Sequence, residues 1–474
     1  MGVALRLHGL FANTFHADEA LFATWARFIA VWRDPLLITQ AVDKPPLPFY
    51  LQAVFYPLFG PMEWAARMPA FIASVLLIAL TAQLARRLTG ERNAALPAAL
   101  FVAVAPLAIQ FSATAFTDPV LTFWLAAALF VAAAPRRAAV RARPRGLLAG
   151  FLFGLAVLSK YQALLFIPLL FGVAWLRGWR RGEWVRGLAG VMVAALALIA
   201  WQAARPAAGD LVALQWANIG GIRAARSWEL WPRALATAEL WRLGLGWPLV
   251  ALGGIVAGAL VWTRRGRFRL APMDALLLLF LLAYVLLHWL WAVPVWDRYL
   301  LPILPLAAVL FGRALSALWR VVGRRESPRW PLAVALLVAS LTLIPVGLAA
   351  RQGRYPLGGQ PTADGGAALA ALALEDAPYG TVLYDHWYSW HWNYQLFDGR
   401  VYVSWFPHAD ALVEDLAVFA GASSDRYIAL PASPAGEPVA RRLSERGYAL
   451  EAVGDQPETA SMTIYRILSR EPAQ

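Results

Sequence analysis

The sequence predicts a polytopic α-helical membrane protein with about 10 to 12 transmembrane helices, followed by a smaller soluble α/β domain outside the membrane. The first observation is composition: 60% of the residues are hydrophobic and 15% are charged, whereas an ordinary soluble domain has about 25% charged residues. One globular core cannot bury so much apolar surface. The second observation is that apolar stretches recur through residues 1–350, each close to the ~20 residues that cross a bilayer.

About ten apolar stretches make up the membrane-spanning part. They lie at residues 64–85, 94–111, 116–134, 146–159, 161–176, 187–204, 240–262, 275–292, 299–319 and 330–348. The pair between 146 and 176 could also be one broken helix, but the Arg content of the flanking loops favours a turn at Lys160. Residues 2–15 contain Arg6 and His8 and are too short to span a bilayer, so we expect a first helix that is truncated or absent.

Arginines gather in alternate loops between these stretches. The Arg-rich loops contain Arg86, Arg87 and Arg92; Arg136, Arg137, Arg141, Arg143 and Arg145; Arg177, Arg180, Arg181 and Arg186; Arg264, Arg265, Arg267 and Arg269; and Arg320, Arg324, Arg325 and Arg329. The short connections between them, such as 112–118, are nearly free of basic residues. Because cytoplasmic loops carry the excess of Arg and Lys, residues 16–63, 205–239 and everything after about 350 are predicted to be extracytoplasmic.

Composition also limits the partners and the chemistry. The net charge of +13 follows from the Arg-rich loops, so we expect no nucleic-acid partner, and the expected surroundings are the lipids of the cytoplasmic (inner) membrane. The chain has no Cys, which excludes disulfides and thiol catalysis. We predict a transmembrane domain at residues 1–350 and a soluble extracytoplasmic domain at 351–474. In the second domain a helical pattern at 434–446 accompanies short β-rich runs at Thr381 to Asp385, Arg400 to Ser404, Arg426 to Leu430 and Met462 to Ile467.

Three charged motifs lie in the outward-facing segments. They are His16-Ala17-Asp18-Glu19, Asp43-Lys44-Pro45-Pro46-Leu47 and Thr117-Asp118-Pro119. Each also has a purely structural explanation. Asp18 and Glu19 suit the start of a helix, Asp118 suits an N-cap ahead of a proline at the first helical position, and Lys44 could be a solvated charge in a turn. Lys44 and Lys160 are the only lysines in a chain rich in arginine, which favours sites that need a compact point charge.

Taken in order, these motifs resemble the type C, polyprenyl-phosphate-dependent glycosyltransferases, in the branch related to protein O-mannosyltransferases and the lipid A aminoarabinose transferase. The resemblance covers about residues 16–320. It rests on the Asp18-Glu19 pair, DKPPL at 43–47 followed by Phe49 and Tyr50, EWAARMP at 63–69, TDPVLTF at 117–123, GLAVLSK at 154–160 and DRYLLPILP at 297–305. The α/β domain is similar to the extracytoplasmic appendage usual in that family.

The resemblance implies an inverting transfer of a sugar from a polyprenyl-phosphate donor to an envelope acceptor, which could be a glycolipid, a polysaccharide or a protein. It also implies the residue roles. Asp18 is the expected general base with Glu19 as its neighbour, Lys44 is a ligand of the donor phosphate, and Asp118 lines the substrate cavity, as do Asp43 and Tyr50.

Two further cations are candidate phosphate ligands. Arg298 lies at an outward helix end, where its guanidinium could grip a phosphate through two hydrogen bonds. Lys160 is the other candidate, although a lysine that extends from a helix end to the membrane surface explains it nearly as well.

Other interpretations remain open. A transporter or flippase of lipid-linked sugars would also be polytopic, but such proteins place ionisable residues near mid-membrane, and here they gather at outward helix ends. A non-catalytic polyprenyl-phosphate-binding protein is the second alternative. Trp387, Trp390 and Trp392 could stack on sugars or simply pack.

No cofactor is predicted with certainty. The glycine-rich fingerprint of nucleotide-binding domains is absent. His16, His288 and His386 have no partners at the spacing of metal ligands, so a divalent metal is not evident and the sequence leaves it open.

Overall fold

The computed structural model describes residues 1–135, 145–219, 223–263, 270–322, 341–419, 425–453 and 461–469. The chain forms two compact units, which we call the helical unit and the sheet unit. The helical unit consists of Met1–Ala12 and Trp25–Gly359, and the sheet unit consists of Asn13–Thr24 and Gln360–Gln474. The sheet unit therefore includes a short segment from near the N-terminus, which contains Asp18 and Glu19.

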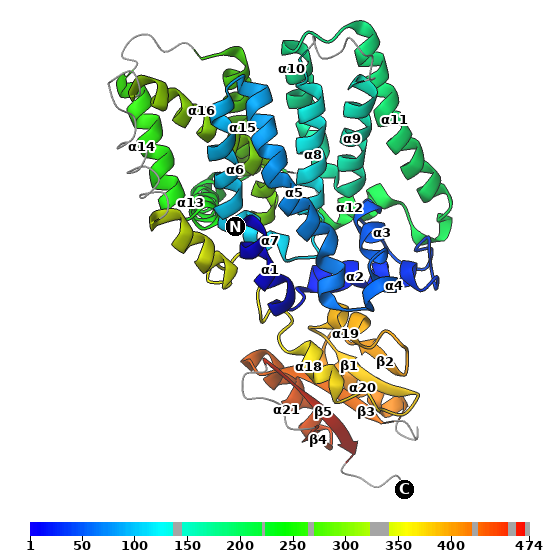
Figure 1. Cartoon of the computed structure of the whole chain (residues 1–474). Helices are drawn as coiled ribbons and strands as arrows, with labels where there is room; N and C mark the ends of the chain where they lie inside the picture. Colours follow the sequence, from blue (N-terminus) through cyan, green and yellow to red (C-terminus); the bar gives the residue numbers. More distant parts are fainter. Residues whose placement is uncertain are drawn as a thin grey trace. The chain divides into compact units, whose positions relative to one another are not determined.

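The helical unit is built from helices of very different length (Figure 1). Their bounds are α1 Gly2–Ala12, α3 Leu47–Ala53, α4 Tyr56–Phe59, α5 Glu63–Thr89, α6 Ala95–Val104, α7 Pro106–Ser112, α8 Asp118–Ala132, α9 Arg145–Ser159, α10 Ile167–Leu176, α11 Arg181–Ala203, α12 Leu211–Ile219, α13 Ser227–Leu245, α14 Trp247–Thr263, α15 Pro272–Leu290 and α16 Leu304–Val322. Short 3-10 helices lie at η1 Arg92–Ala94, η3 Tyr161–Phe166, η4 Pro206–Ala208 and η5 Asp297–Ile303. Helix α2 (Ala17–Ala30) contributes residues to both units.

Among the described residues, four helical runs are long and apolar enough to cross a membrane: α5, α11, α15 and Asp297–Arg320. The bent pair Arg92–Val104 and Pro106–Ser112 makes five if it is one span. Shorter apolar helices cover most of the other expected stretches. They are Gly2–Ala12, Leu47–Phe59, Asp118–Ala132, Arg145–Ser159, Tyr161–Leu176 and Leu341–Arg351. The chain is thus a helical membrane protein, and the larger number of spans stays a prediction.

Some sequence predictions lie outside the described residues. Part of the stretch 330–348 lies outside them. The arginines that lie outside them are those at 136, 137, 141, 143, 264, 265, 267, 269, 324, 325 and 329. One predicted stretch is wrong as a single helix: 240–262 is divided into α13 and α14 at Gly246, whose φ is 75°. That left-handed backbone is readily adopted only by glycine and ends α13. The predicted break at Lys160 is present, because α9 ends at Ser159 and Lys160 is extended.

The stretch 94–111 is also broken, between α6 and α7, with a bend of 58°. Pro106 begins α7 and has no N–H to donate to the carbonyl of Val102, four residues earlier. The guanidinium of Arg6 donates there instead, at 2.9 Å, and also to the carbonyl of Ala103 at 3.0 Å. Its Nε donates to the hydroxyl of Ser74 at 2.9 Å. Arg6, which hydropathy alone left unexplained, therefore satisfies the carbonyls freed by the bend.

The sheet unit has a five-stranded sheet in the order β2-β1-β3-β5-β4. The strands are β1 Thr381–Asp385, β2 Val401–Trp405, β3 Arg426–Pro431, β4 Tyr448–Ala452 and β5 Met462–Ser469. Strands β2, β1 and β3 are parallel, and β5 pairs antiparallel with both β3 and β4. The four predicted strands are present within two residues, whereas β4 was not predicted.

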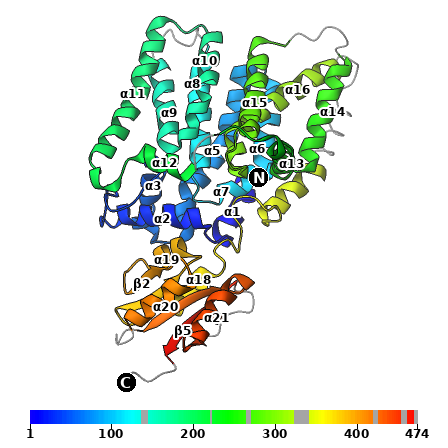
Figure 2. The ribbon, with the colours of Figure 1, turned by 180° about the vertical axis from the view of Figure 1, so that it is seen from behind.

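Four helices cover this sheet (Figure 2): α18 Ala367–Leu372, α19 Ser389–Gln395, α20 Ala409–Val418 and α21 Glu437–Glu445. Leu383 and Ala429 of the sheet pack with α18 and α19 in one core, and Tyr384 and Ile428 pack with α20 and α21 in the other. Because neighbouring strand residues point to opposite faces, these two cores bury the central strands β1 and β3 on both sides.

Candidate active site

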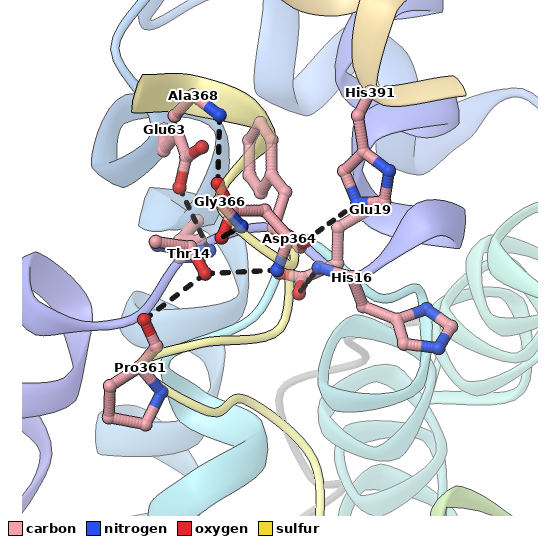
Figure 3. Close-up of polar contacts among 11 residues, drawn as sticks. Thr14, His16, Glu19, Glu63, Pro361, Asp364, Gly366, Ala368 and His391 are labelled. Atoms are coloured by element: carbon pink, nitrogen blue, oxygen red, sulfur yellow. Dashed lines mark hydrogen bonds and ion pairs between the residues drawn. The ribbon is translucent and has the colours of Figure 1, made fainter. Parts of the chain in front are cut away.

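The Asp18-Glu19 pair lies in the first turn of α2, inside the sheet unit. The backbone N–H of Asp18 donates to Nδ1 of His16 at 3.2 Å. The backbone N–H of His16 donates to a carboxylate oxygen of Glu19 at 3.0 Å (Figure 3). His16 is therefore the N-cap residue of α2: its side chain accepts the N–H of Asp18, and the Glu19 side chain accepts the N–H of His16. Glu19 is fully buried, whereas Asp18 is partly exposed. The structural explanation weighed from the sequence therefore applies to Glu19, and His16 was missed as the cap.

Lys44 lies in the helical unit, in the irregular segment before α3. Its ammonium donates to the carboxylate of Asp43 at 2.5 Å, and the side-chain amide of Asn218 donates to the same carboxylate oxygen at 2.6 Å. Both side chains of the ion pair are about one-sixth exposed, at 18% and 17%. The pair therefore remains within reach of a ligand.

The loop before Lys44 has an internal framework centred on Asp34. The Asp34 carboxylate accepts the backbone N–H groups of Ile38 at 2.8 Å and Thr39 at 2.7 Å. Tyr50 of α3 donates its hydroxyl hydrogen to the carbonyl of Pro35 at 2.7 Å and accepts the indole N–H of Trp201 at 3.0 Å. Tyr50, which was predicted to line the substrate cavity, thus holds this loop through its hydrogen bond to Pro35.

Arg205 is the strongest support of the same loop, and sequence reasoning missed it. Its guanidinium follows the end of α11 and donates twice to the carbonyl of Leu37, at 3.0 and 2.7 Å, and once to the carbonyl of Gln40, at 2.8 Å. It lies 4.0 Å above the ring of Trp201 and is 1% exposed. The signal that could have found it is an Arg in a segment predicted to be outward, where the Arg bias does not explain it.

Asp118 and Lys160 form an ion pair that joins the start of α8 to the end of α9. The ammonium of Lys160 donates to the carboxylate of Asp118 at 2.6 Å, and Asp118 is almost fully buried. The N-cap position of α8 is Thr117, so the Asp118 carboxylate serves the ion pair and does not act as the N-cap. Lys160 also lies 4.8 Å from the ring centre of Tyr299.

Arg298 lies in η5, with its guanidinium 4.9 Å from the ring centre of Phe116 and 5.3 Å from that of Trp296. Lys44, Lys160 and Arg298 come from well-separated parts of the sequence, and all three lie in the helical unit. Lys44 is paired with Asp43 and Lys160 with Asp118. Cationic side chains of this kind can bind an anionic ligand such as a phosphate.

Within the described ranges, no group of three or more acidic or histidine side chains is placed to hold a metal ion. His288 contacts the backbone carbonyl of Tyr284, and His386 that of Phe406.

Comparisons with known proteins agree with these motifs. Residues 43–203 match the family described as dolichyl-phosphate-mannose-protein mannosyltransferase. The chain is 30% identical over 211 residues to an undecaprenyl phosphate-alpha-4-amino-4-deoxy-L-arabinose arabinosyl transferase of Pseudomonas paraeruginosa, covering 42% of this chain and 37% of that protein. The corresponding protein of Erwinia tasmaniensis is 28% identical over 170 residues, covering 35% of this chain and 31% of that protein. The matched segments thus span about a third of these curated relatives.

The fold is similar to solved structures over nearly the whole chain. ArnT from Cupriavidus metallidurans in the apo state has a TM-score of 0.65 at 18% identity, covering 98% of this chain and 97% of that chain. The same protein bound to undecaprenyl phosphate has a TM-score of 0.65 at 17% identity, covering 100% and 98%. These findings confirm the resemblance that the motifs indicated: residues 43–203 carry the sequence pattern of the dolichyl-phosphate-mannose-protein mannosyltransferase family, in a helical membrane protein with an ArnT-like fold.

Proposed function

We propose that this chain is an inverting glycosyltransferase that moves a sugar from a polyprenyl-phosphate donor to an envelope acceptor on the outer side of the cytoplasmic membrane. In this proposal residues 1–350 form the transmembrane domain, with about 10 to 12 spans, and residues 351–474 form an extracytoplasmic domain. The observation that carries the proposal is the buried ion pair of Lys160 with Asp118, in a helical unit that also contains the cations Lys44 and Arg298. It offers a phosphate site in a chain that lacks a nucleotide-binding fingerprint.

The roles follow from the chemistry of the transfer. The acceptor hydroxyl oxygen attacks the anomeric carbon of the sugar, and the bond between that carbon and the phosphate oxygen breaks. Asp18 takes the hydroxyl proton as general base. The polyprenyl phosphate leaves with the bonding electrons, and Lys44, with Arg298 and Lys160, stabilises the negative charge that grows on it. The donor lipid stays in the bilayer, so no soluble sugar nucleotide is needed.

The names of the relatives and of the matching family indicate a class of donor. The names of the two arabinosyl transferases point to undecaprenyl phosphate-linked 4-amino-4-deoxy-L-arabinose, and the description of the matching family points to dolichyl phosphate-linked mannose. We infer a donor of this class, with a pentose or hexose on a polyprenyl phosphate. The acceptor is a glycolipid, a polysaccharide or a protein.

The direct test uses the purified full chain in nanodiscs. It is given undecaprenyl phosphate-linked 4-amino-4-deoxy-L-arabinose or polyprenyl-phosphate mannose, together with an envelope extract. We expect free polyprenyl phosphate and labelled acceptor to appear together, and both to be lost with Asp18→Asn. In proteoliposomes, movement of the intact lipid-linked sugar across the bilayer without cleavage would instead establish the flippase alternative. Mass spectrometry of envelope glycans in a deletion strain would then identify the acceptor.

The orientation is tested separately with reporter fusions. Fusions after Arg143 and after Arg267 should report a cytoplasmic location, and a fusion after Gly365 should report export, because Arg-rich loops stay inside. A cytoplasmic signal at Gly365 contradicts the proposed sidedness and, with it, the proposed extracytoplasmic reaction.

A further inference from the structure

Two stretches of the sheet unit, residues 360–364 and helix α19, contact the segment just before α2, and the first contact is made by Thr14. Its backbone N–H donates to the carbonyl of Gln360 at 3.2 Å, and its hydroxyl donates to the carbonyl of Pro361 at 3.2 Å. The same hydroxyl accepts the backbone N–H of Asp364 at 3.1 Å (Figure 3). Both the backbone and the side chain of Thr14 are therefore hydrogen-bonded to residues 360–364.

Asp364 is itself anchored at the start of α18. Its buried carboxylate accepts the backbone N–H of Gly366 at 3.1 Å and that of Ala368 at 2.9 Å. A carboxylate that caps backbone N–H groups at a helix start resists displacement. Thr14 is thus attached to a rigid point of the sheet unit.

The second holding contact comes from His391 of α19. Its side chain is 5% exposed, and Nε2 lies 3.0 Å from the carbonyl oxygen of Phe15. A carbonyl only accepts, so Nε2 carries the hydrogen of this bond. Nδ1 is buried and has no hydrogen-bond partner among the described residues. The ring of Phe15 packs edge-on against Tyr394 with centroids 4.9 Å apart.

Helix α19 is fixed to the sheet by Asp385, the last residue of β1. The fully buried Asp385 carboxylate accepts the backbone N–H of Tyr388, the hydroxyl of Ser389 at 2.8 Å and the indole N–H of Trp392 at 3.1 Å. A continuous path of buried contacts therefore runs from β1 through α19 and His391 to Phe15, which is three residues before Asp18.

We propose that His391 is a positioning residue, which with Thr14 sets the start of α2 and thereby the placement of the Asp18 carboxylate. This inference rests on the proposed function, in which Asp18 is the general base. Misplacing a catalytic group by about 1 Å can cost on the order of 10²-fold in rate. The cations assigned to the donor phosphate lie in the helical unit, so loss of the His391 contact lowers kcat and leaves the donor KM nearly unchanged.

The test compares two substitutions at one position. His391→Gln keeps an N–H donor at the place of Nε2, and His391→Leu removes it. We expect His391→Leu to lower kcat by about 10 to 100-fold, with the donor KM within about twofold, and His391→Gln to recover most of that loss. Hydrogen–deuterium exchange should rise in residues 13–20 of His391→Leu and stay near wild type in His391→Gln.

The matched control is His386→Leu. His386 contacts the carbonyl of Phe406 at 2.7 Å in the same unit but touches no residue of the 13–16 segment in the contacts described. It should change neither the exchange of residues 13–20 nor kcat beyond about twofold. Thr14→Val, which removes only the hydroxyl, repeats the test if His391→Leu does not fold, with the same expected direction.

The outcomes separate this inference from the proposed function. Raised exchange in residues 13–20 with normal kcat, while Asp18→Asn is inactive, overturns the positioning role and leaves the proposed function standing. Normal turnover of Asp18→Asn overturns Asp18 as the general base, and with it the positioning role, whatever the exchange shows. Absence of sugar transfer by the wild-type chain overturns the proposed function. An equal loss of kcat in His391→Leu and His386→Leu also overturns the positioning role, because it reveals a general loss of structure.

Discussion

The two motif segments of the first loop are held in different ways. Residues 13–16, which lead to Asp18, contact residues 360–364 and α19 of the sheet unit through a threonine hydroxyl, a histidine ring and backbone groups, and the Glu19 carboxylate accepts the backbone N–H of His16. Residues 34–42, which lead to Lys44, are fixed in the helical unit by charged groups, the carboxylate of Asp34 and the guanidinium of Arg205.

This difference indicates that the two halves of the proposed reaction depend on different parts of the chain. Changes in the sheet unit should act on the proposed base and therefore on kcat. Changes around Arg205 should act on the proposed donor site and therefore on the donor KM. Substitutions in each region test this difference.

The largest expected effect is that of Asp18→Asn. Asparagine keeps the size and most hydrogen-bonding capacity of aspartate but cannot take a proton, so kcat should fall by about 10² to 10⁴-fold while donor affinity is kept. Steady-state transfer and donor titration on the purified variant measure both quantities. Near-normal turnover would move the base to Glu19 or Asp118.

Lys44→Ala should have the next largest effect, and this effect should be mainly on the donor KM. A hydrogen bond to a charged group contributes about 1.5 to 3 kcal/mol, so the donor KM should rise by about 10 to 100-fold, and kcat should fall to the extent that leaving-group charge grows. Lys44→Arg is the sharper variant, because a site shaped for a point charge loses activity with a planar guanidinium. Wild-type constants in both variants would reduce Lys44 to a surface charge and leave Arg298 as the phosphate ligand.

Arg205→Met should raise the donor KM by about tenfold, equivalent to 1.4 kcal/mol, and lower the thermal stability. It leaves the carbonyls of Leu37 and Gln40 without their guanidinium donors, which costs about 1 to 3 kcal/mol for each buried group. Arg87→Met is the matched control, since Arg87 also donates to a carbonyl, that of Phe130 at 2.7 Å. If both variants lose stability equally and neither changes the donor KM, Arg205 has no special link to Lys44.

The smallest effect concerns the pH dependence of stability in the sheet unit. Burial lowers the pKa of His391 below its ordinary value of about 6.5, and the charge of His16 lowers it further. The hydrogen bond to Phe15 and the charges of Asp364 and Asp385 raise this pKa, but burial has the largest effect. The unfolded chain therefore binds a proton more readily than the folded one. Stability from this group is full above about pH 6.5 and is lost as the pH falls toward the lower folded-state pKa.

The measurement is thermal unfolding at pH 7.5 and at pH 5.5. The wild-type chain should lose more stability on acidification than His391→Gln, which has no titrating ring. His386→Gln serves as the control and should behave like wild type. Identical pH dependence in wild type and His391→Gln would show that His391 does not stay neutral in the folded unit.

Sequence reasoning reached the helical membrane class, four of the five strands and the motif residues, because each depends on local properties. Hydrophobic length, the Arg bias of loops and short motifs can be read within windows of about 20 residues. The same reasoning missed β4, because its sequence, Tyr448–Ala452, has no clear alternation and the strand exists through its pairing with β5. It also placed one helix across Gly246, where hydropathy continues but the backbone turns.

The sequence by itself thus determined the class of the protein, the order of its helices and the candidate chemistry at Asp18, Lys44, Asp118 and Arg298. Only the tertiary structure decided which groups support them. Lys160 meets Asp118 across 42 residues, Arg205 meets Leu37 across 168, and His391 meets Phe15 across 376. No local pattern encodes such contacts, because each arises when buried polar groups from distant segments must find hydrogen-bond partners in the packed protein.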